Sequence, residues 1–473
     1  MNTREKYKKL LMGLATLLLL AALTALFALT WFRDYANTEG MAGAFYRRGH
    51  YAVIALYVVM TCVFGKALGA FRAGSARIIE SSYTQVLCLL MTNALTYLEL
   101  CLIGKWRFLT NLHPLLLMTV AQVVVIFVWV LATRRWYVRM YPPRKLLLIH
   151  GAYDPHDLIQ KFTSRAELYS IQETISIELG WDAVIEKVNG YSSILLMDIP
   201  ATIRNELMKY CFANNIRCYC VPKISDIMIK SAKEVNIFDT SLLLFRNMGL
   251  SVEQRMFKRA FDVVFSLLAI IISSPFMLII AAAIKLYDGG PVFFTQERLT
   301  RDGKVFKIYK FRSMRVEPAN SEYCMTRKND DRITPVGKII RNIHFDELPQ
   351  IINILKGDMS FVGPRPECPK LAQEYCETVA EFPFRLKVKA GLTGYAQVYG
   401  KYNTTPYDKL KLDLIYIQNY SFLLDMKLLI LTVKILFQKE NTEGIESWQT
   451  NAAKSNLMED SQDESPEEAQ EVN

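Results

Sequence analysis

The sequence predicts an integral membrane protein of mixed class, with an α-helical transmembrane bundle followed by α/β and mainly helical soluble domains. Its 473 residues are 51% hydrophobic, with a mean hydropathy of +0.14, too apolar for a soluble protein and too polar for an all-helical transporter. Long apolar runs are confined to the first 140 residues and to one later segment. Elsewhere, short apolar runs alternate with helical patterns, as in α/β domains.

The first 140 residues contain four candidate membrane helices, at residues 10–32, 51–71, 83–104 and 115–133. The first is 23 residues long without a charge, enough to cross roughly 30 Å of hydrocarbon. It lacks the small-residue cleavage site of a signal peptide, so we expect a membrane anchor. Glu99 lies near the end of the third segment, which favours an interfacial carboxylate over a functional intramembrane one.

Charge predicts the orientation of these helices. Four cations precede the first helix and five follow the fourth, which places both ends in the cytoplasm. Arg47 and Arg48 lie in the first outer loop, where the positive-inside rule disfavours cations. The flanking cations are Arg4, Lys6, Lys8 and Lys9, and then Arg134, Arg135, Arg139, Arg144 and Lys145.

The formal net charge of +10 is unevenly distributed. Residues 450–473 hold seven acidic residues and one lysine, a net of −6, so the rest of the chain carries +16. A basic body beside apolar segments suits anionic lipids, lipid phosphates or nucleotide substrates. Nucleic acid fits less well, because no recognisable nucleic-acid-binding module accompanies the charge. The acidic tail is predicted to be disordered by its composition.

Residues 141–250 show an α/β pattern. Apolar runs at 146–150, 193–197 and 216–221 alternate with helical stretches such as 203–213, which predicts a parallel sheet with covering helices. The first strand ends without a G-x-G-x-x-G motif, so a regulatory or scaffolding role is favoured over dinucleotide binding. The nine cysteines form no C-x-x-C pair and are expected to be free thiols.

A fifth apolar stretch, residues 263–284, contains Ser274 and Pro275 at its middle. Proline removes a backbone donor, so a kink is expected there. Cations flank both ends of the stretch, which suits a helix-break-helix hairpin that enters and leaves on one face. A kinked spanning helix fits the same residues about equally well. After it, runs at 293–299 and 305–314 predict a β-hairpin. Residues 423–437 suit an interfacial amphipathic helix, and a helix packed in the core would show a similar pattern.

The densest polar constellation surrounds Asp346 and Glu347. Pro349 and the apolar run after it place a helix start at about Asp346. A carboxylate there meets free backbone N–H groups and the positive end of the helix dipole, which keep it ionised. Taken alone, Asp346 is better explained as an ordinary N-cap than as a functional residue.

Four cations change this interpretation. Arg341 lies just upstream, Arg365 stands between two prolines that stiffen its backbone, and Lys310 and Arg312 alternate on one predicted strand. Adjacent acids amid phosphate-gripping cations predict a phosphoryl site with a divalent ion, the acids acting as nucleophile or metal ligand. Asp358 is expected to be structural. Asp413 and Asp425 could line the site or lie on solvated helix faces, and residues 391–395 could bring backbone close to a nucleotide or simply form a turn.

Five motifs, in order over residues 258–439, resemble the bacterial sugar transferases, which are monotopic polyprenyl-phosphate phosphoglycosyl transferases. The motifs are FKIYKFRSM (306–314), DELPQ (346–350), KGDMSFVGPRP (356–366), AGLTGYAQV (390–398) and SFLLD (421–425). The four N-terminal helices and the α/β domain resemble the long-form members that initiate capsule or exopolysaccharide synthesis.

The resemblance implies roles for the site residues. Asp346 would attack the β-phosphorus of a UDP-sugar, release UMP and form a covalent phosphosugar-aspartyl intermediate. Undecaprenyl phosphate would then displace Asp346. Glu347 would assist with Mg²⁺ or with proton handling, and Arg365 and Arg341 would bind phosphate. Ser274 and Pro275 match the break of the family's re-entrant membrane helix, which favours the hairpin.

The residue patterns and the resemblance together predict four regions along the chain. A transmembrane region (1–140) precedes a Rossmann-like α/β cytoplasmic domain (141–250), a mainly helical catalytic domain (251–449) with a re-entrant helix at 261–286, and the acidic tail (450–473). The expected location is the cell membrane, with catalysis on the cytoplasmic face. A second copy or polysaccharide-assembly proteins are candidate partners. Two rival functions are a lipid-phosphate phosphatase and a non-enzymatic membrane scaffold; the sequence does not select the sugar.

Overall fold

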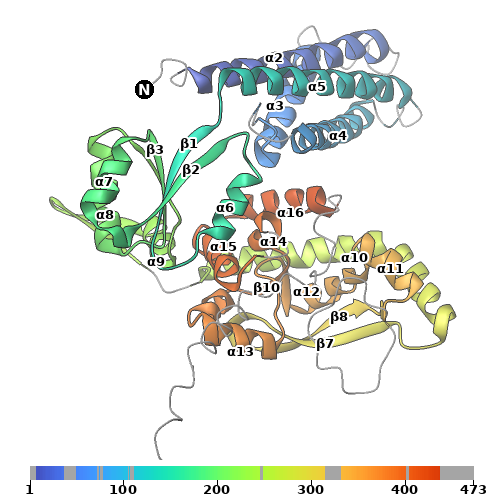
Figure 1. Cartoon of the computed structure of the whole chain (residues 1–473). Helices are drawn as coiled ribbons and strands as arrows, with labels where there is room; N and C mark the ends of the chain where they lie inside the picture. Colours follow the sequence, from blue (N-terminus) through green and yellow to red (C-terminus); the bar gives the residue numbers. More distant parts are fainter. Residues whose placement is uncertain are drawn as a thin grey trace, which may run out of the picture. The chain divides into compact units, whose positions relative to one another are not determined.

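The computed structural model describes residues 7–36, 49–71, 74, 78–104, 106, 111–245, 249–314, 332–400 and 404–436. The predicted acidic tail and the cations at positions 4, 6, 47 and 48 lie outside these ranges. The chain divides into two compact units, Met1–Pro222 and Lys223–Asn473, whose elements are drawn in Figure 1.

Four long helices form the membrane region of the first unit and confirm the four predicted segments. Each helix is apolar enough and long enough to cross a membrane. Phe27, Trp31, Tyr57 and Leu100 pack at its core. The helices are α2 (Lys8–Thr30, continued by a π-helical turn, Trp31–Tyr35), α3 (Gly49–Leu68), α4 (Ile78–Ile103) and α5 (His113–Met140).

A neutral polar network joins these four helices. The Gln122 amide donates to the Leu23 carbonyl at 3.0 Å and to the Tyr57 hydroxyl at 2.9 Å. Tyr57 donates to Asn93 at 3.3 Å, and Asn93 donates to the side-chain oxygens of Thr119 (2.8 Å) and Gln122 (3.0 Å). Each buried amide therefore has partners, as a low-dielectric interior requires. We name these side chains, Tyr57, Asn93, Thr119 and Gln122, the bundle network.

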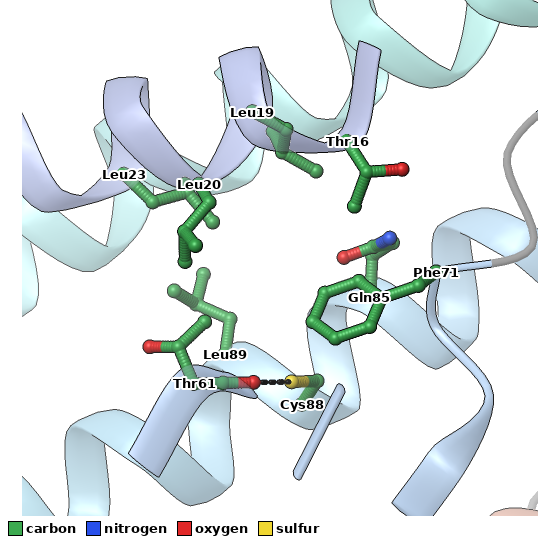
Figure 2. Close-up of a pocket in the computed structure, with 9 residues that line it drawn as sticks. All are labelled: Thr16, Leu19, Leu20, Leu23, Thr61, Phe71, Gln85, Cys88 and Leu89. Atoms are coloured by element: carbon green, nitrogen blue, oxygen red, sulfur yellow. Dashed lines mark hydrogen bonds between the residues drawn. The ribbon is translucent and has the colours of Figure 1, made fainter. Parts of the chain in front are cut away.

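A small cavity lies between α2, α3 and α4. Figure 2 shows its largely apolar lining, with the Cys88 thiol directed at the Thr61 carbonyl 3.8 Å away. Its volume of about 10 Å³ holds one water molecule at most. The cavity is therefore a packing defect of the bundle and has no room for a substrate.

The α/β part of the first unit is a four-stranded sheet in the order β2-β1-β3-β4, and every pair in it is parallel. Three strands match the predicted runs, whereas β2 was not predicted because its exposed edge position leaves polar residues along it. The elements are β1 (Arg144–His150), α6 (His156–Thr163), β2 (Tyr169–Ser176), η3 (Ile177–Leu179), α7 (Trp181–Asn189), β3 (Ser193–Met197), α8 (Ala201–Ala213) and β4 (Arg217–Cys220).

The second unit begins earlier than the predicted boundary at residue 250. Helix α9 (Ile224–Lys230) belongs to it, because Ile224 and Ile227 share a buried cluster with Leu410 and Leu414 of α15 (Pro406–Gln418). A β-ribbon follows, made of β5 (Lys233–Ile237) and β6 (Thr240–Leu244).

Helix α10 (Val252–Asp288) precedes the remaining elements of this unit, which carry the predicted site. The predicted hairpin is present as β7 (Phe293–Leu299) and β8 (Val305–Phe311), joined by η4 (Arg301–Gly303). The others are α11 (Pro335–Asn342), η5 (Phe345–Glu347), α12 (Gln350–Lys356), β9 (Met359–Val362), α13 (Pro369–Thr378), η6 (Phe382–Lys387), β10 (Ala390–Thr393), α14 (Tyr395–Tyr399) and α16 (Phe422–Leu436).

The expectation of free thiols holds for most described cysteines but not for Cys368. Seven cysteines are free, among them the close pair Cys218 and Cys220. Cys368, which lies immediately before α13, is disulfide-bonded, so the sequence-based expectation is wrong at that position. Spacing along the chain could not reveal it, because a disulfide depends on tertiary proximity.

Helix α10 continues through Ser274 and Pro275, so the expected break is a bend within one helix of 37 residues. In Figure 1 it changes direction toward its yellow end. Pro275 has no N–H to donate to the Ile271 carbonyl, and the Ser274 hydroxyl donates to that carbonyl instead, at 2.9 Å. The serine thereby satisfies the acceptor that the proline leaves free.

Both ends of α10 are attached to the same core. Near its start, Arg259 donates to the carbonyls of Ile354 and Leu355 at the end of α12, both at 2.7 Å. Near its end, Ile280 and Ile284 pack with buried residues of β8 and α11. Between these anchors its outer face is apolar and exposed, with Ile271 and Ile272 each about 70% accessible.

Candidate active site

The two predicted carboxylates lie on a short turn between two helices. Helix α11 ends at Asn342, and His344 takes a left-handed backbone conformation with φ of 56°. Asp346 and Glu347 then occupy the 3₁₀ turn η5, and α12 begins only at Gln350. A 3₁₀ turn thus lies at the helix start predicted at about Asp346, and the α-helix itself begins four residues later. The left-handed backbone of His344 interrupts the helix before η5, and Pro349 has no N–H to donate a helical hydrogen bond.

Glu347 is bound by two cations from different elements. Lys310 of β8 donates to its Oε1 at 2.7 Å, and Arg365 donates to the same oxygen at 3.4 Å. Burial alone would raise the pKa of Glu347, but Lys310 and Arg365 hold that pKa well below its usual range. Glu347 is therefore ionised and fixed in orientation.

Asp346 has no hydrogen-bond partner for its carboxylate within the described residues. Burial and the adjacent Glu347 charge raise its pKa, while Lys310, Arg341 and His344 act to lower it. Arg341, in the last turn of α11, is thus close enough to act on Asp346 electrostatically. A partly buried carboxylate that has no hydrogen-bond partner and lies beside cations could serve as a nucleophile or as a metal ligand.

Arg312 is held elsewhere. Strand β8 ends at Phe311, and the Arg312 guanidinium forms an ion pair with Asp288 at the end of α10. Its side chain lies against Gly290, where an added Cβ would come within 2.0 Å of Nη1. The structure therefore joins Lys310 to Glu347, whereas Arg312 fixes the connection between α10 and β7.

The other polar candidates serve the fold. Asp413 is buried and receives a hydrogen bond from Arg385 at 2.8 Å. Asp425 is buried against Lys258 at 2.5 Å and Tyr416 at 2.8 Å. Asp358 accepts from Asn353 at 3.3 Å, as a structural turn residue would. Neither Asp413 nor Asp425 is the solvated helix-face residue that was one of their alternatives.

Sequence reasoning missed three residues around the site. Arg298 of β7 donates to the Pro366 carbonyl at 3.4 Å and to Gln296 at 2.6 Å. Glu367 and Arg385 form a buried ion pair behind Arg365. The only available signal was the proximity of Glu367 to Arg365 in sequence, because the other contacts depend on the tertiary fold.

The chemistry of the site fits a magnesium ion. Within the described residues, no group of three or more His, Cys, Asp and Glu side chains is placed to hold a metal. Mg²⁺ commonly needs only one or two carboxylates, with substrate phosphates and water as its other ligands. Asp346 offers an unpaired carboxylate, and Glu347 has one oxygen outside the Lys310 and Arg365 contacts. These two residues are the ones that could hold the ion.

The chain matches known proteins over the unit that carries this site. The family model described as bacterial sugar transferase matches residues 253–439. A UDP-glucose:undecaprenyl-phosphate glucose-1-phosphate transferase of Klebsiella pneumoniae is 43% identical over 183 residues, which are 38% of this chain and 39% of that protein. The exopolysaccharide production protein PSS of Rhizobium leguminosarum bv. phaseoli is 41% identical over 187 residues, 37% of this chain and 92% of that protein.

A longer match extends beyond this unit. A UDP-N-acetylgalactosamine-undecaprenyl-phosphate N-acetylgalactosaminephosphotransferase of Aeromonas hydrophila is 30% identical over 305 residues, 63% of this chain and 68% of that protein. The match to the Klebsiella protein, by contrast, spans about two fifths of that relative. From the motifs, the geometry of the site and these matches, the chain belongs to the bacterial sugar transferase family.

Proposed function

We propose that this protein transfers a sugar-1-phosphate from a UDP-sugar to undecaprenyl phosphate, releasing UMP, at the start of exopolysaccharide or capsule repeat-unit synthesis. One observation carries the proposal. The Asp346 carboxylate is unpaired within the described residues, while the neighbouring Glu347 is neutralised by Lys310 and Arg365. The names of the Klebsiella and Aeromonas relatives state reactions of this kind, with different sugars.

The placement of these charges supports the two-step reaction that the family resemblance implies. The Asp346 oxygen attacks the β-phosphorus of the donor, and the bond from that phosphorus to the bridging oxygen breaks as UMP leaves with the electron pair. Arg365 and Arg341 stabilise the charge that develops on the phosphoryl oxygens. An oxygen of undecaprenyl phosphate then attacks the same phosphorus and releases the Asp346 carboxylate. Two steps at one site spare the enzyme from holding both substrates together.

Asp346 and Glu347 are the proposed holders of a magnesium ion. When bound, the ion would supply charge neutralisation for the donor's diphosphate. Lys310 keeps Glu347 ionised, so the pair presents oxygen ligands at neutral pH.

The fold supports a site at a membrane surface. A straight helix of the length of α10 would extend about 55 Å, yet both its ends contact elements of one core. We infer that α10 enters and leaves the bilayer on one face, bent at Pro275, with its exposed apolar face in lipid. The cations at the end of α5 favour the cytoplasmic face. In the first unit, the parallel order β2-β1-β3-β4 supports a Rossmann-like domain.

UMP release tests the proposal. Purified wild-type protein in nanodiscs is given magnesium, undecaprenyl phosphate and a panel of UDP-sugars. We expect release with one sugar or a narrow set, dependent on the lipid for multiple turnover. Hydrolysis of lipid phosphate without a UDP-sugar would indicate a phosphatase instead. Folded protein that releases UMP from no donor would contradict the proposal and favour a scaffold.

A further inference from the structure

Arg365 lies on a segment without regular secondary structure that is nevertheless held along its whole length. The segment joins β9 to α13. Four successive carbonyls in it each accept a hydrogen bond from a different donor. These bonds are Gly391 N to Pro364 O (2.9 Å), Arg385 Nη2 to Arg365 O (3.0 Å), Arg298 Nη1 to Pro366 O (3.4 Å) and Leu299 N to Glu367 O (2.9 Å).

The bond to Arg365 itself comes from a buried guanidinium. Arg385 is only 2% exposed, and its three nitrogens are all engaged. Nε donates to Asp413 at 2.8 Å, Nη1 to Glu367 at 3.3 Å and Nη2 to the Arg365 carbonyl. Lys409 forms an ion pair with Glu367, so two cations balance two carboxylates. The guanidinium is thereby locked in one orientation.

A contribution to stability is a weak explanation for a buried ion-pair group such as the one around Arg385. Burying ion pairs costs desolvation, and apolar residues of similar size often stabilise a core as well or better. An apolar residue could not donate a hydrogen bond to the Arg365 carbonyl. Arg385 makes this bond, and the carboxylates of Asp413 and Glu367 fix the direction of its guanidinium. The Arg365 side chain, in turn, reaches Glu347 at 3.4 Å. A continuous chain of polar contacts therefore runs from Asp413 to the catalytic pair.

We propose that Arg385, oriented by Asp413 and Glu367, is a positioning residue that fixes Arg365 for binding the donor's diphosphate. The inference rests on the proposed function for its effect on turnover. Arg385 touches no reacting atom and acts only through the backbone of Arg365. Lysine keeps the charge but lacks the planar fork, so it cannot reach all three acceptors at once.

The test is a double-mutant cycle between Arg385→Lys and Arg365→Ala, read both as UDP affinity by calorimetry and as kcat/KM for the donor. Alone, Arg385→Lys is expected to weaken both quantities about 10- to 100-fold. In the Arg365→Ala background it is expected to change either quantity by less than about twofold, because the residue it positions is gone.

An equal loss in both backgrounds would overturn the inference and leave Arg385 a structural residue. Leu410→Ala is the matched control, because Leu410 is fully buried on α15, the helix that carries Asp413. Its effect is expected to be the same in both backgrounds. If Arg385→Lys does not fold, Asp413→Asn replaces it in the same cycle. Failure of the proposed function would appear differently, as coupling in UDP affinity without turnover by wild type.

Discussion

Two polar clusters in this molecule differ in their charge balance. The bundle network in the membrane region is uncharged, and each of its buried amides has hydrogen-bond partners. The cluster on η5 is charged, and the Asp346 carboxylate has no hydrogen-bond partner among the described residues. A fully satisfied neutral network serves the fold, because nothing in it is left to react. A cluster that leaves one charged group unpaired gives up stability for reactivity.

The largest effect is expected from removing that unpaired charge. Asp346→Asn should lower kcat by about 10⁴-fold or more, as loss of a nucleophile does in other covalent enzymes. Thermal stability should stay the same or rise, because a partly buried, unpaired charge is removed. Steady-state UMP release and a melting curve measure the two effects. Asp302→Asn, an exposed turn residue, is the control. A destabilised, still active Asp346→Asn chain would make Asp346 a structural residue.

Arg365 and Arg312 should differ in what their removal affects, activity in the first case and stability in the second. Arg365→Ala is expected to lower kcat/KM for the donor about 10²- to 10³-fold while leaving the melting temperature nearly unchanged, since its side chain is half exposed. Arg312→Ala should instead lower the melting temperature, because it removes a buried guanidinium and its ion pair with Asp288. Donor titrations and melting curves of both variants provide the comparison. The reverse pattern would mean that Arg312 binds phosphate.

Lys310→Gln should move the pH dependence of activity. Asp346 must be ionised to attack, and burial and Glu347 raise its pKa above the ordinary aspartate value, whereas Lys310 acts to lower it. Without Lys310 that pKa rises further, so the acid limb of the kcat/KM profile shifts to higher pH. Lys307→Gln, exposed on the same strand, is the control and should leave the profile in place. A shift to lower pH would contradict this electrostatic role.

The smallest effect is expected in the membrane bundle. Asn93→Leu breaks the bundle network and should destabilise that region by about 1 kcal/mol, in line with interhelical hydrogen bonds in other membrane proteins. The kcat of the folded protein should be unchanged. Unfolding in mixed micelles and UMP release are the two measurements. A large loss of kcat at unchanged stability would show that the bundle network takes part in catalysis.

The sequence predicted what depends on neighbours along the chain. The four membrane helices, three of the four strands of the α/β sheet and the hairpin β7–β8 follow from periodicity, and Asp346, Glu347 and Arg365 lie in short motifs. What it could not predict depends on distant contacts. The pairing of Arg312 with Asp288 and the buried Arg385 group join residues far apart in sequence. The left-handed turn at His344 was missed because no glycine signals it.

The most direct test is to trap the covalent intermediate. Wild-type protein is incubated with magnesium and the preferred UDP-sugar in the absence of lipid, and its intact mass is measured. The account predicts one sugar-phosphate per chain, located on Asp346 by peptide mapping, absent from Asp346→Asn and removed when undecaprenyl phosphate is added. UMP formed only when lipid is present, from a chain that never gains mass, would contradict the central role given to Asp346.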